Sequence, residues 1–448
     1  MNSLSCRLMR PRRVAAWTGS LLGVWLGMLA ALPWASAQGI ALRGVGAINE
    51  SMGGAATACP LDAAGAIHWN PASISGLEAS EMSFGMTLIL PQSRLSSTIQ
   101  PNALGPGVPP VKLTGSDWGE PGVTPVPTMA FVHRDPDSPW SYGVGLFGVG
   151  GSSVNYSASA TNPILNPKIP GMIGQLAATV DVLQVAPTLS YAFTERFSVG
   201  FAPTLTMAKL YATPLFLGPK DAAGEYPSGV GTRYSWGGGF QAGAYYIADG
   251  GWHFGGSVKS PQWMEPFRYN GETSGGVPEL IQFGLYYPLI VSTGVAYSGF
   301  ERWILACDVR YFDYADTLGF SKSGFDPTTK AVTGLGWRSI MGVNLGAQRQ
   351  VGENLYLRVG YSVNENPITS DVVQYNIASP LIIQHELHMG FSYNLPGDWI
   401  ASLAYVHAFD NTVSGKMINP STNQPLAGTS IETEAAADAV TFGISRRF

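Results

Sequence analysis

Charged side chains are scarce in this sequence of 448 residues, because Asp, Glu, Lys and Arg together make up only 12% of it. A soluble domain usually carries a charge on about a quarter of its residues. The scarcity therefore disfavours an ordinary soluble globular protein. The acids outnumber the bases by 30 to 25, and an acidic chain is repelled by phosphates, so nucleic acid is excluded as a partner.

Cysteine and histidine are also rare. Of three cysteines, Cys6 lies in an N-terminal leader, and the other two, Cys59 and Cys307, cannot form a disulfide framework. Six histidines are scattered without a G-x-S-x-G motif. The sequence His385-Glu386-Leu387-His388 lacks the helical spacing of a zinc site, and on a strand its two histidines would face opposite ways. We expect no metal, no cofactor and no catalytic role; an outer-membrane enzyme acting on lipid is the alternative of another class.

Long hydrophobic runs are absent except for Val14 to Leu32. Four arginines precede this run and Ala35-Ser36-Ala37 follows it. A basic start, an apolar middle and a small-x-small end predict a secretory signal over residues 1–37, cleaved before Gln38. A single membrane anchor is the alternative, because the run is near the length of a span. Losing the four arginines leaves 21 bases against 30 acids, a net charge of −9.

The stretch from Gln38 to Leu77 is rich in Gly and Ala and poor in large apolar residues. It cannot form a core of its own, so the rest of the chain must enclose it. We interpret residues 38–78 as a hatch inside a barrel. Near its end, Asn70-Pro71-Ala72 predicts a rigid turn, because Pro71 fixes its own φ and moves Asn70 out of the helical region. An ordinary surface turn is the alternative.

Strict alternation of apolar and polar residues runs through the second half of the chain. In Leu355 to Asn364 the odd positions are large and apolar, and the even positions include Arg358, Ser362 and Asn364. Trp303 to Phe312 and Arg338 to Gln348 repeat the pattern. One face of each strand then meets lipid and the other meets water.

Fourteen strands are predicted in all. Their connections alternate between long polar loops and short turns such as Asp249-Gly250 and Pro396-Gly397. An even strand count with this alternation is the layout of a bacterial outer-membrane barrel and not of a soluble sandwich. We therefore expect an all-β fold: a 14-stranded antiparallel transmembrane β-barrel over residues 79–448, in the outer membrane and surrounded by its lipid, with the hatch in its lumen. The predicted strands are 79–90, 126–134, 140–149, 176–193, 196–211, 232–247, 251–262, 283–298, 302–315, 336–349, 354–364, 381–394, 398–409 and 436–448.

The chain ends in an alternating strand that stops at Phe448. A terminal Phe on such a strand resembles the signal that the barrel-assembly machinery recognises, so that machinery is an expected partner. Arg446 departs from the pattern, because it falls on the lipid face. It fits there only if its side chain extends to the membrane interface.

The order of these features resembles the FadL/TodX-type outer-membrane transporters of long-chain fatty acids and aromatic hydrocarbons. The resemblance rests on the Gly-rich start with Gly53 and Gly54, the acid Asp62, the Asn-Pro-Ala turn, the strand rhythm and the terminal Phe. It implies a monomeric barrel that captures a hydrophobic ligand at its loops and holds it in a lumen pocket. The ligand then leaves sideways through a gap at a kinked third strand, by diffusion and without a cofactor.

The expected function is passive transport of long-chain fatty acids, with uptake of aromatic hydrocarbons such as toluene as the alternative. A general diffusion porin is disfavoured, because it would lack a plug.

The predicted third strand is rich in glycine, at Gly143, Gly145, Gly148, Gly150 and Gly151. Glycine weakens a strand and permits bulges, so these positions are the expected kink and lateral opening. Close packing of strands is the alternative. Three of the glycines spell G-x-G-x-x-G, but no βαβ unit surrounds them, which excludes a dinucleotide site.

Alternation places four charged side chains in the lumen: Asp308, Arg310, Arg338 and Arg358. The arginines are candidates for holding a fatty-acid carboxylate, because a guanidinium binds carboxylate with two parallel hydrogen bonds. The alternative is ion pairing with acids such as Asp308 and Glu386. Two long loops, 88–127 and 162–176, carry apolar residues that either bind ligand or close the barrel mouth.

Overall fold

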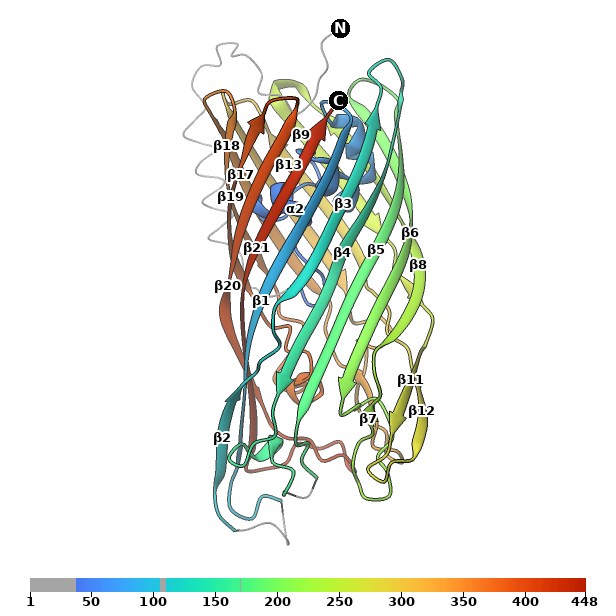
Figure 1. Ribbon diagram of the computed structural model, residues 1–448, viewed down its shortest axis with the longest axis vertical. Coiled ribbons are helices and arrows are strands. Elements are labelled where there is room, and N and C mark those ends of the chain that lie inside the picture. Colours follow the sequence, from blue (N-terminus) through green and yellow to red (C-terminus); the bar gives the residue numbers. More distant parts are fainter. Residues whose placement is uncertain (1–37, 105–109, 170) are drawn as a thin grey trace.

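A closed antiparallel β-barrel forms the body of the protein (Figure 1). The structure, a computed structural model, describes residues 38–104, 110–169 and 171–448, so the predicted leader lies outside the described residues. Sixteen strands share one sheet; β2 (Leu113–Trp118) and β10 (Trp263–Met264) only extend it, and the other fourteen close into the barrel where β8 pairs with β9. The predicted fold class is confirmed. The barrel strands are β1 (Glu81–Ile99), β3 (Thr124–Arg134), β4 (Trp140–Tyr156), β5 (Leu176–Ala192), β6 (Phe197–Thr213), β8 (Arg233–Ile247), β9 (Trp252–Lys259), β13 (Leu289–Tyr297), β14 (Trp303–Asp313), β17 (Ile340–Val351), β18 (Leu355–Asn364), β19 (His385–Leu395), β20 (Trp399–Gly415) and β21 (Thr429–Arg447).

Every predicted strand corresponds to one barrel strand, but several are longer than predicted. β1 and β21 stay paired out to Ile99 and Thr429, well beyond the predicted limits of 90 and 436. These extensions carry Ser, Thr, Arg and Glu, so the apolar alternation that marks a lipid-facing strand is lost there. The loop strands β7 (Ser228–Gly229), β11 (Phe267–Glu272), β12 (Pro278–Phe283), β15 (Ser323–Phe325) and β16 (Val332–Leu335) were outside the prediction, because they are short and not lipid-facing.

Large apolar side chains cover the outside of the barrel. On β18, Leu357 and Val359 are exposed while Arg358 and Ser362 are buried, as the alternation predicts. Exposed aromatic residues gather near both ends, including Trp140, Phe193, Phe197 and Phe300 at one end and Trp118, Tyr234, Trp236 and Trp263 at the other. Two aromatic girdles around an apolar band are typical of a barrel in a lipid bilayer.

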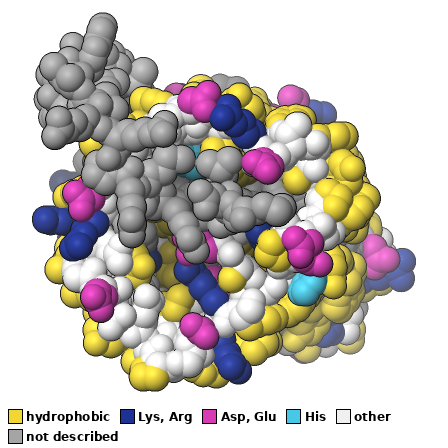
Figure 2. Space-filling model, turned by 90° about the horizontal axis from the view of Figure 1, so that it is seen from above, with side chains coloured by type: hydrophobic (Ala, Val, Ile, Leu, Met, Phe, Trp, Pro, Cys, Tyr) yellow, Lys and Arg dark blue, Asp and Glu magenta, His cyan; other side chains and the backbone are white. Residues whose placement is uncertain are grey.

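The two ends of the barrel differ. The C-terminus and the short turns lie at one end, and the small strands β2, β7, β11 and β12 lie at the other (Figure 1). Figure 2 looks onto the first end and shows acidic and basic side chains spread around its rim, with hydrophobic side chains along the outside.

Phe448 lies at this end, is exposed and stacks on Phe131, with ring centroids 6.2 Å apart. Arg446 lies over the Trp399 ring at 5.6 Å. The role of Phe448 in assembly stays a prediction.

The long loops pack on one another. Their buried side chains include Leu165, Phe267, Tyr269, Phe320 and Trp337, which join the largest hydrophobic cluster of the described residues. Other large apolar side chains of the loops are exposed, among them Val111, Trp118, Val123, Val277, Leu280 and Leu318. Many apolar side chains of the loops thus pack together, and the two expected roles of these loops, ligand binding and closure of the barrel mouth, stay predictions.

The N-terminal segment lies within the barrel, near the end with the short turns (Figure 1). It contains two short helices, α2 (Gly46–Ser51) and α3 (Ala63–Trp69), and a 3₁₀ turn, η1 (Pro71–Gly76). Asp62 caps α3 by accepting a hydrogen bond from the Gly65 N–H at 3.3 Å. All residues of both helices are buried. No helix in the described part of the chain has the length and hydropathy needed to cross a membrane.

Candidate transport cavity and hatch

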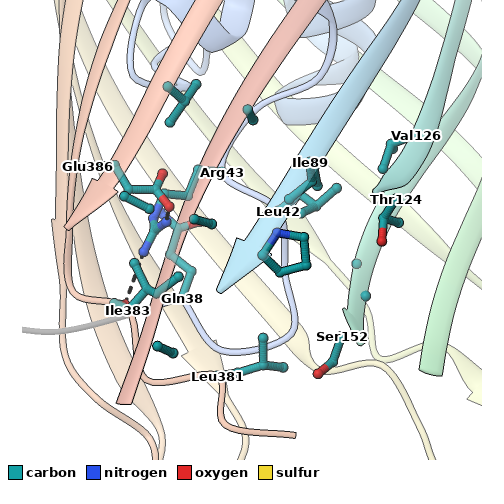
Figure 3. A pocket seen from close by; sticks show the side chains of 18 of the residues that line it. Gln38, Leu42, Arg43, Ile89, Thr124, Val126, Ser152, Leu381, Ile383 and Glu386 are labelled. Atoms are coloured by element: carbon teal, nitrogen blue, oxygen red, sulfur yellow. Dashed lines mark hydrogen bonds and ion pairs between the residues drawn. The ribbon is translucent and has the colours of Figure 1, made fainter. Parts of the chain in front are cut away.

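A cavity of about 210 Å³ lies between the N-terminal segment and the barrel wall. Residues 38–44 form one side of it, and residues of β1, β3, β4, β5 and β19 to β21, together with Pro380, Leu381 and Ile383, form the other. Figure 3 shows Leu42 near Ile89 at its centre, Arg43 and Glu386 on one side, and Thr124 and Val126 opposite. Residues 38–44 are thus part of the cavity lining.

The barrel wall beside the cavity lacks a continuous ladder of backbone hydrogen bonds. β3 and β4 pair from Arg134–Ser141 to Thr128–Phe147, and the pairing stops there although both strands continue. Pro127 and Pro125 follow on β3 and have no N–H with which to extend a ladder. Cavity-lining residues therefore stand on both sides of an unpaired stretch of wall.

β4 carries a bulge at the same level. Gly148 pairs with Leu183 and Gly150 with Val182, so Val149 is the extra residue. The hatch segment covers the bulge: the Leu42 N–H donates to Val149 O at 2.9 Å, and the Gly151 N–H donates to Ile40 O at 3.2 Å. The N-terminal chain thus acts as a short extra strand at the place where β3 leaves β4 unpaired.

The glycines predicted to matter in this strand are all in tight positions. A Cβ at Gly148 would overlap Val126, and one at Gly150 would lie 2.6 Å from Ile40 O. A Cβ at Gly151 would lie 2.9 Å from Val180 O. Gly143 and Gly145 lie nearer the end with the short turns, within the paired part, where a Cβ would overlap Phe131 O and the Phe147 ring. Only the first three adjoin the unpaired wall.

Asn70, Pro71 and Ala72 tie the hatch to the barrel. Asn70 has an extended backbone, as expected before Pro, and caps η1 by accepting from the Ala72 N–H at 3.1 Å. Its amide donates to Ala244 O on β8 at 2.9 Å and to Thr57 O at 2.8 Å. Ser190 on β5 and Ser198 on β6 both donate to Ala72 O, at 3.1 and 3.0 Å. The motif is an anchor to three strands and not a surface turn.

Asp308 and Arg310 form a second anchor, on β14. Asp308 Oδ2 accepts from the N–H groups of Ala56 and Thr57, both at 2.9 Å, and pairs with Arg310 at 2.8 Å. Arg310 donates to Gly54 O at 2.6 Å and lies 3.3 Å from the centre of the Trp69 ring. Both side chains are fully buried. They hold the hatch, and Arg310 is not free to receive a carboxylate.

The other two predicted lumen arginines lie away from the cavity. Arg358 is buried at the end with the short turns, where it donates to Gln348 and Ser392, both at 2.7 Å. The prediction for Arg338 is wrong. It precedes β17, is exposed, and donates to Asn366 O at 2.9 Å. The apolar alternation of β17 does not extend back to Arg338, because the chain there is already in a loop.

The cation that does line the cavity is Arg43, in the hatch. It forms an ion pair with Glu386 on β19 and donates to Ile383 O at 3.2 Å. Glu386 also lies 3.4 Å from the His388 ring nitrogen. Glu386 thus pairs with a hatch residue and not with the predicted arginines of the wall.

These features, a barrel of fourteen strands with an anchored N-terminal segment and a lumen cavity, can be compared with known proteins. The model of the outer membrane protein transport family (OMPP1/FadL/TodX) matches residues 26–448. The chain belongs to this family. FadL/TodX-family proteins are transport proteins of the outer membrane and not enzymes, so the predicted location and the non-enzymatic assignment are confirmed. No curated protein sequence matches the chain.

Solved structures of this family share the fold at low sequence identity. The toluene transporter TodX of P. putida is 15% identical, with 91% of this chain and 99% of TodX covered and a TM-score of 0.64. A FadL homologue of Pseudomonas aeruginosa is 13% identical, with 91% and 98% covered and a TM-score of 0.65. The toluene transporter TbuX of Ralstonia pickettii is 17% identical, with 91% and 99% covered and a TM-score of 0.60.

Sequence reasoning missed several residues that shape the cavity of this FadL/TodX-family chain: Arg43, Glu50, Thr124 and Val126. Two signals were present. Arg43 and Glu50 are charged residues in a hatch segment that is otherwise Gly- and Ala-rich. The sequence Thr-Pro-Val-Pro-Thr at 124–128 sets two prolines, which cannot donate to a ladder, at the start of a predicted strand.

Proposed function

We propose that this protein is a passive channel that takes uncharged hydrophobic molecules into the cavity beside residues 38–44 and releases them sideways between β3 and β4. The observation that carries the proposal is the end of the β3–β4 ladder at Thr128–Phe147, directly beside a cavity lined by residues of both strands. The β5–β6 register is also interrupted, between Val185–Leu205 and Leu189–Phe201, but it resumes on the other side, whereas the β3–β4 pairing does not.

The sideways route agrees with the chemistry of an apolar ligand. A molecule released into water re-exposes its apolar surface, at about 25 cal/mol for each Å², whereas release into lipid avoids this cost. The opening is small in this structure, because Val126 packs against Gly148 and residues 40–42 cover the bulge. Passage therefore requires these residues to shift, which is possible because no backbone hydrogen bonds join β3 to β4 there.

The charges of the cavity favour an uncharged ligand over a fatty acid. Its one arginine, Arg43, is neutralised by Glu386, and of the other acids in the lining Asp181 pairs with Lys209 and Asp438 lies 2.9 Å from the His407 ring nitrogen. Among the described residues, a carboxylate would therefore meet no unpaired arginine but would meet the unpaired Glu50, and like charges at close range repel. The relatives described as toluene transporters and a monoaromatic hydrocarbon channel support the same alternative, uptake of aromatic hydrocarbons.

Uptake of labelled toluene and labelled oleate, measured side by side, tests the proposal. The protein would be expressed in cells that lack their own transporter, and its assembly checked by heat-modifiable gel mobility. We expect uptake of toluene above the level of cells without the protein, and little gain for oleate. Oleate uptake equal to or above that of toluene would restore the fatty-acid role. Uptake of neither by an assembled barrel would contradict the channel function.

A further inference from the structure

Two buried polar side chains in the cavity lining, Gln38 and Glu50, have no role in the transport of a plain hydrocarbon. Gln38 lines the cavity (Figure 3) and is only 1% exposed. Its amide nitrogen donates to Asn344 Oδ1 at 3.2 Å. Because the Asn344 amide nitrogen donates to Gly53 O at 2.5 Å, the orientation of both amides is fixed. The Gln38 carbonyl oxygen Oε1 is thereby left buried without a hydrogen-bond partner.

Glu50, on α2, is the second such group. It lines the same cavity and is 8% exposed. Its carboxyl accepts from the Thr87 hydroxyl at 2.9 Å and from the Thr441 hydroxyl. No ion pair to Glu50 exists among the residues that the structure describes. Burial raises the pKa of Glu50 to about 7, since the charged form is poorly solvated there.

The one arginine of the cavity is already used. The Arg43 guanidinium is shared between Glu386, Ile383 O and Asn364 Oδ1. Thr124 and Ser152 stand at the side of the wall opening, and their hydroxyls can donate or accept. The Gln38 carbonyl oxygen Oε1 is nevertheless left unpaired, and an unpaired buried acceptor costs free energy until a donor reaches it.

We propose that the cavity is a binding site for hydrophobic molecules that carry one hydroxyl group, such as phenols or long-chain alcohols, with the hydroxyl donating to Gln38 Oε1 or to the Glu50 carboxyl. The inference rests on the proposed channel function and names its preferred substrate class. A hydroxyl is favoured over an ammonium group, because an uncharged group loses less hydration free energy than a charged group when it leaves water. A carboxylate has no proton to donate to Gln38 Oε1, and the Arg43 guanidinium is already paired with Glu386.

Three small molecules of nearly equal shape separate these possibilities: p-cresol, toluene and p-toluate. The assembled full-length protein in lipid vesicles would be tested for saturable uptake of each. We expect p-cresol uptake to reach half-saturation at a concentration about fivefold lower than toluene uptake, because one good hydrogen bond changes affinity by about that factor. We expect no saturable uptake of p-toluate. Equal half-saturation by p-cresol and toluene would overturn the inference while leaving the channel function intact. Failure of both would contradict the channel itself.

Two variants test the assignment to Gln38 and Glu50. Gln38→Leu keeps the size of the side chain but removes the acceptor, so the ratio of the half-saturation concentrations of toluene and p-cresol should fall toward unity. Gln282→Leu, the same change at an exposed position of β12, is the matched control and should keep the preference. N-terminal processing of Gln38→Leu would be checked by intact mass.

Glu50→Gln provides a measurement that does not depend on the N-terminal residue. The amide can donate as well as accept and removes the negative charge, so p-toluate should gain saturable uptake. Continued exclusion of p-toluate by assembled Glu50→Gln protein, together with an unchanged p-cresol preference in Gln38→Leu, would overturn the inference.

Discussion

Single side chains decide how firmly the hatch is held. Asp308 alone accepts two backbone N–H groups and the Thr57 hydroxyl from the hatch, and also pairs with Arg310. Arg310 in turn reaches Gly54 O and Arg43 O. Because a buried charge without its partner is strongly unfavourable, these two residues act as one unit. Their role in the lumen is structural, which sequence alternation alone could not distinguish from ligand binding.

At this scale we predict that Asp308→Asn loosens the hatch without preventing barrel assembly. Removing one partner of a buried pair costs about 3–5 kcal/mol, so hydrogen exchange of the amides of residues 54–57 should become faster. The measurement is hydrogen exchange followed by mass spectrometry in detergent micelles.

The matched control for this prediction is Asp249→Asn. Its ion pair with Arg196 lies on an exposed turn, where such a pair contributes about 0–1 kcal/mol. If Asp308→Asn exchanged no faster than Asp249→Asn, Asp308 would not be an anchor of the hatch.

At the scale of single elements, β3 and β4 form the part of the barrel wall where backbone pairing between neighbouring strands ends. Pro125 and Pro127 on β3 have no N–H to donate to β4, and the bulge at Val149 changes the direction of β4. Residues 40–42 then supply the backbone partners that β3 does not. The same stretch of hatch therefore lines the cavity and covers the bulge, so a shift of these residues would alter the cavity and the opening together.

We expect Gly148→Val to reduce toluene uptake strongly in an assembled barrel. The new side chain would overlap Val126 and wedge the two strands where the opening begins. The control is Gly256→Val on β9, because a Cβ there meets only Ser292 O, at 3.9 Å. Normal uptake by assembled Gly148→Val protein would rule out the lateral route between β3 and β4.

At the scale of the whole molecule, the barrel and the segment inside it are separable parts. The fourteen barrel strands pair with one another in a closed sheet, and the N-terminal segment joins this pairing only through the isolated bridge from Ala41 to Gly150. The hatch has two short helices and a 3₁₀ turn, and its stability comes from contacts with the wall. Removing it should leave a barrel that is intact but open.

Deletion of residues 38–77, with the leader retained, should convert the closed barrel into an ion-conducting one. The measurement is single-channel conductance of purified protein in planar bilayers, with the full-length chain as reference. Conductance equal to that of the full-length protein would show that residues 38–77 do not plug the lumen.

Much of the architecture follows from local sequence. Period-two alternation places Leu357 and Val359 outward and Arg358 inward because successive side chains of a strand point to opposite faces. Pro71 fixes the extended conformation of Asn70 for equally local reasons. Such rules need only neighbouring residues, and they also gave the count of strands and their order.

The sequence by itself therefore determined that the chain is an outer-membrane barrel with an enclosed, Gly-rich N-terminal segment. Only the tertiary structure decided which side chains face the cavity. Arg310 and Asp308 hold the hatch, Arg338 lies outside the lumen, and Arg43 meets Glu386 across more than three hundred residues of chain. Alternation shows on which face of a strand a residue lies. It does not show which residues that side chain contacts inside the barrel. Those contacts depend on how the strands close and on the path of the hatch, which bring together residues that are far apart in the sequence.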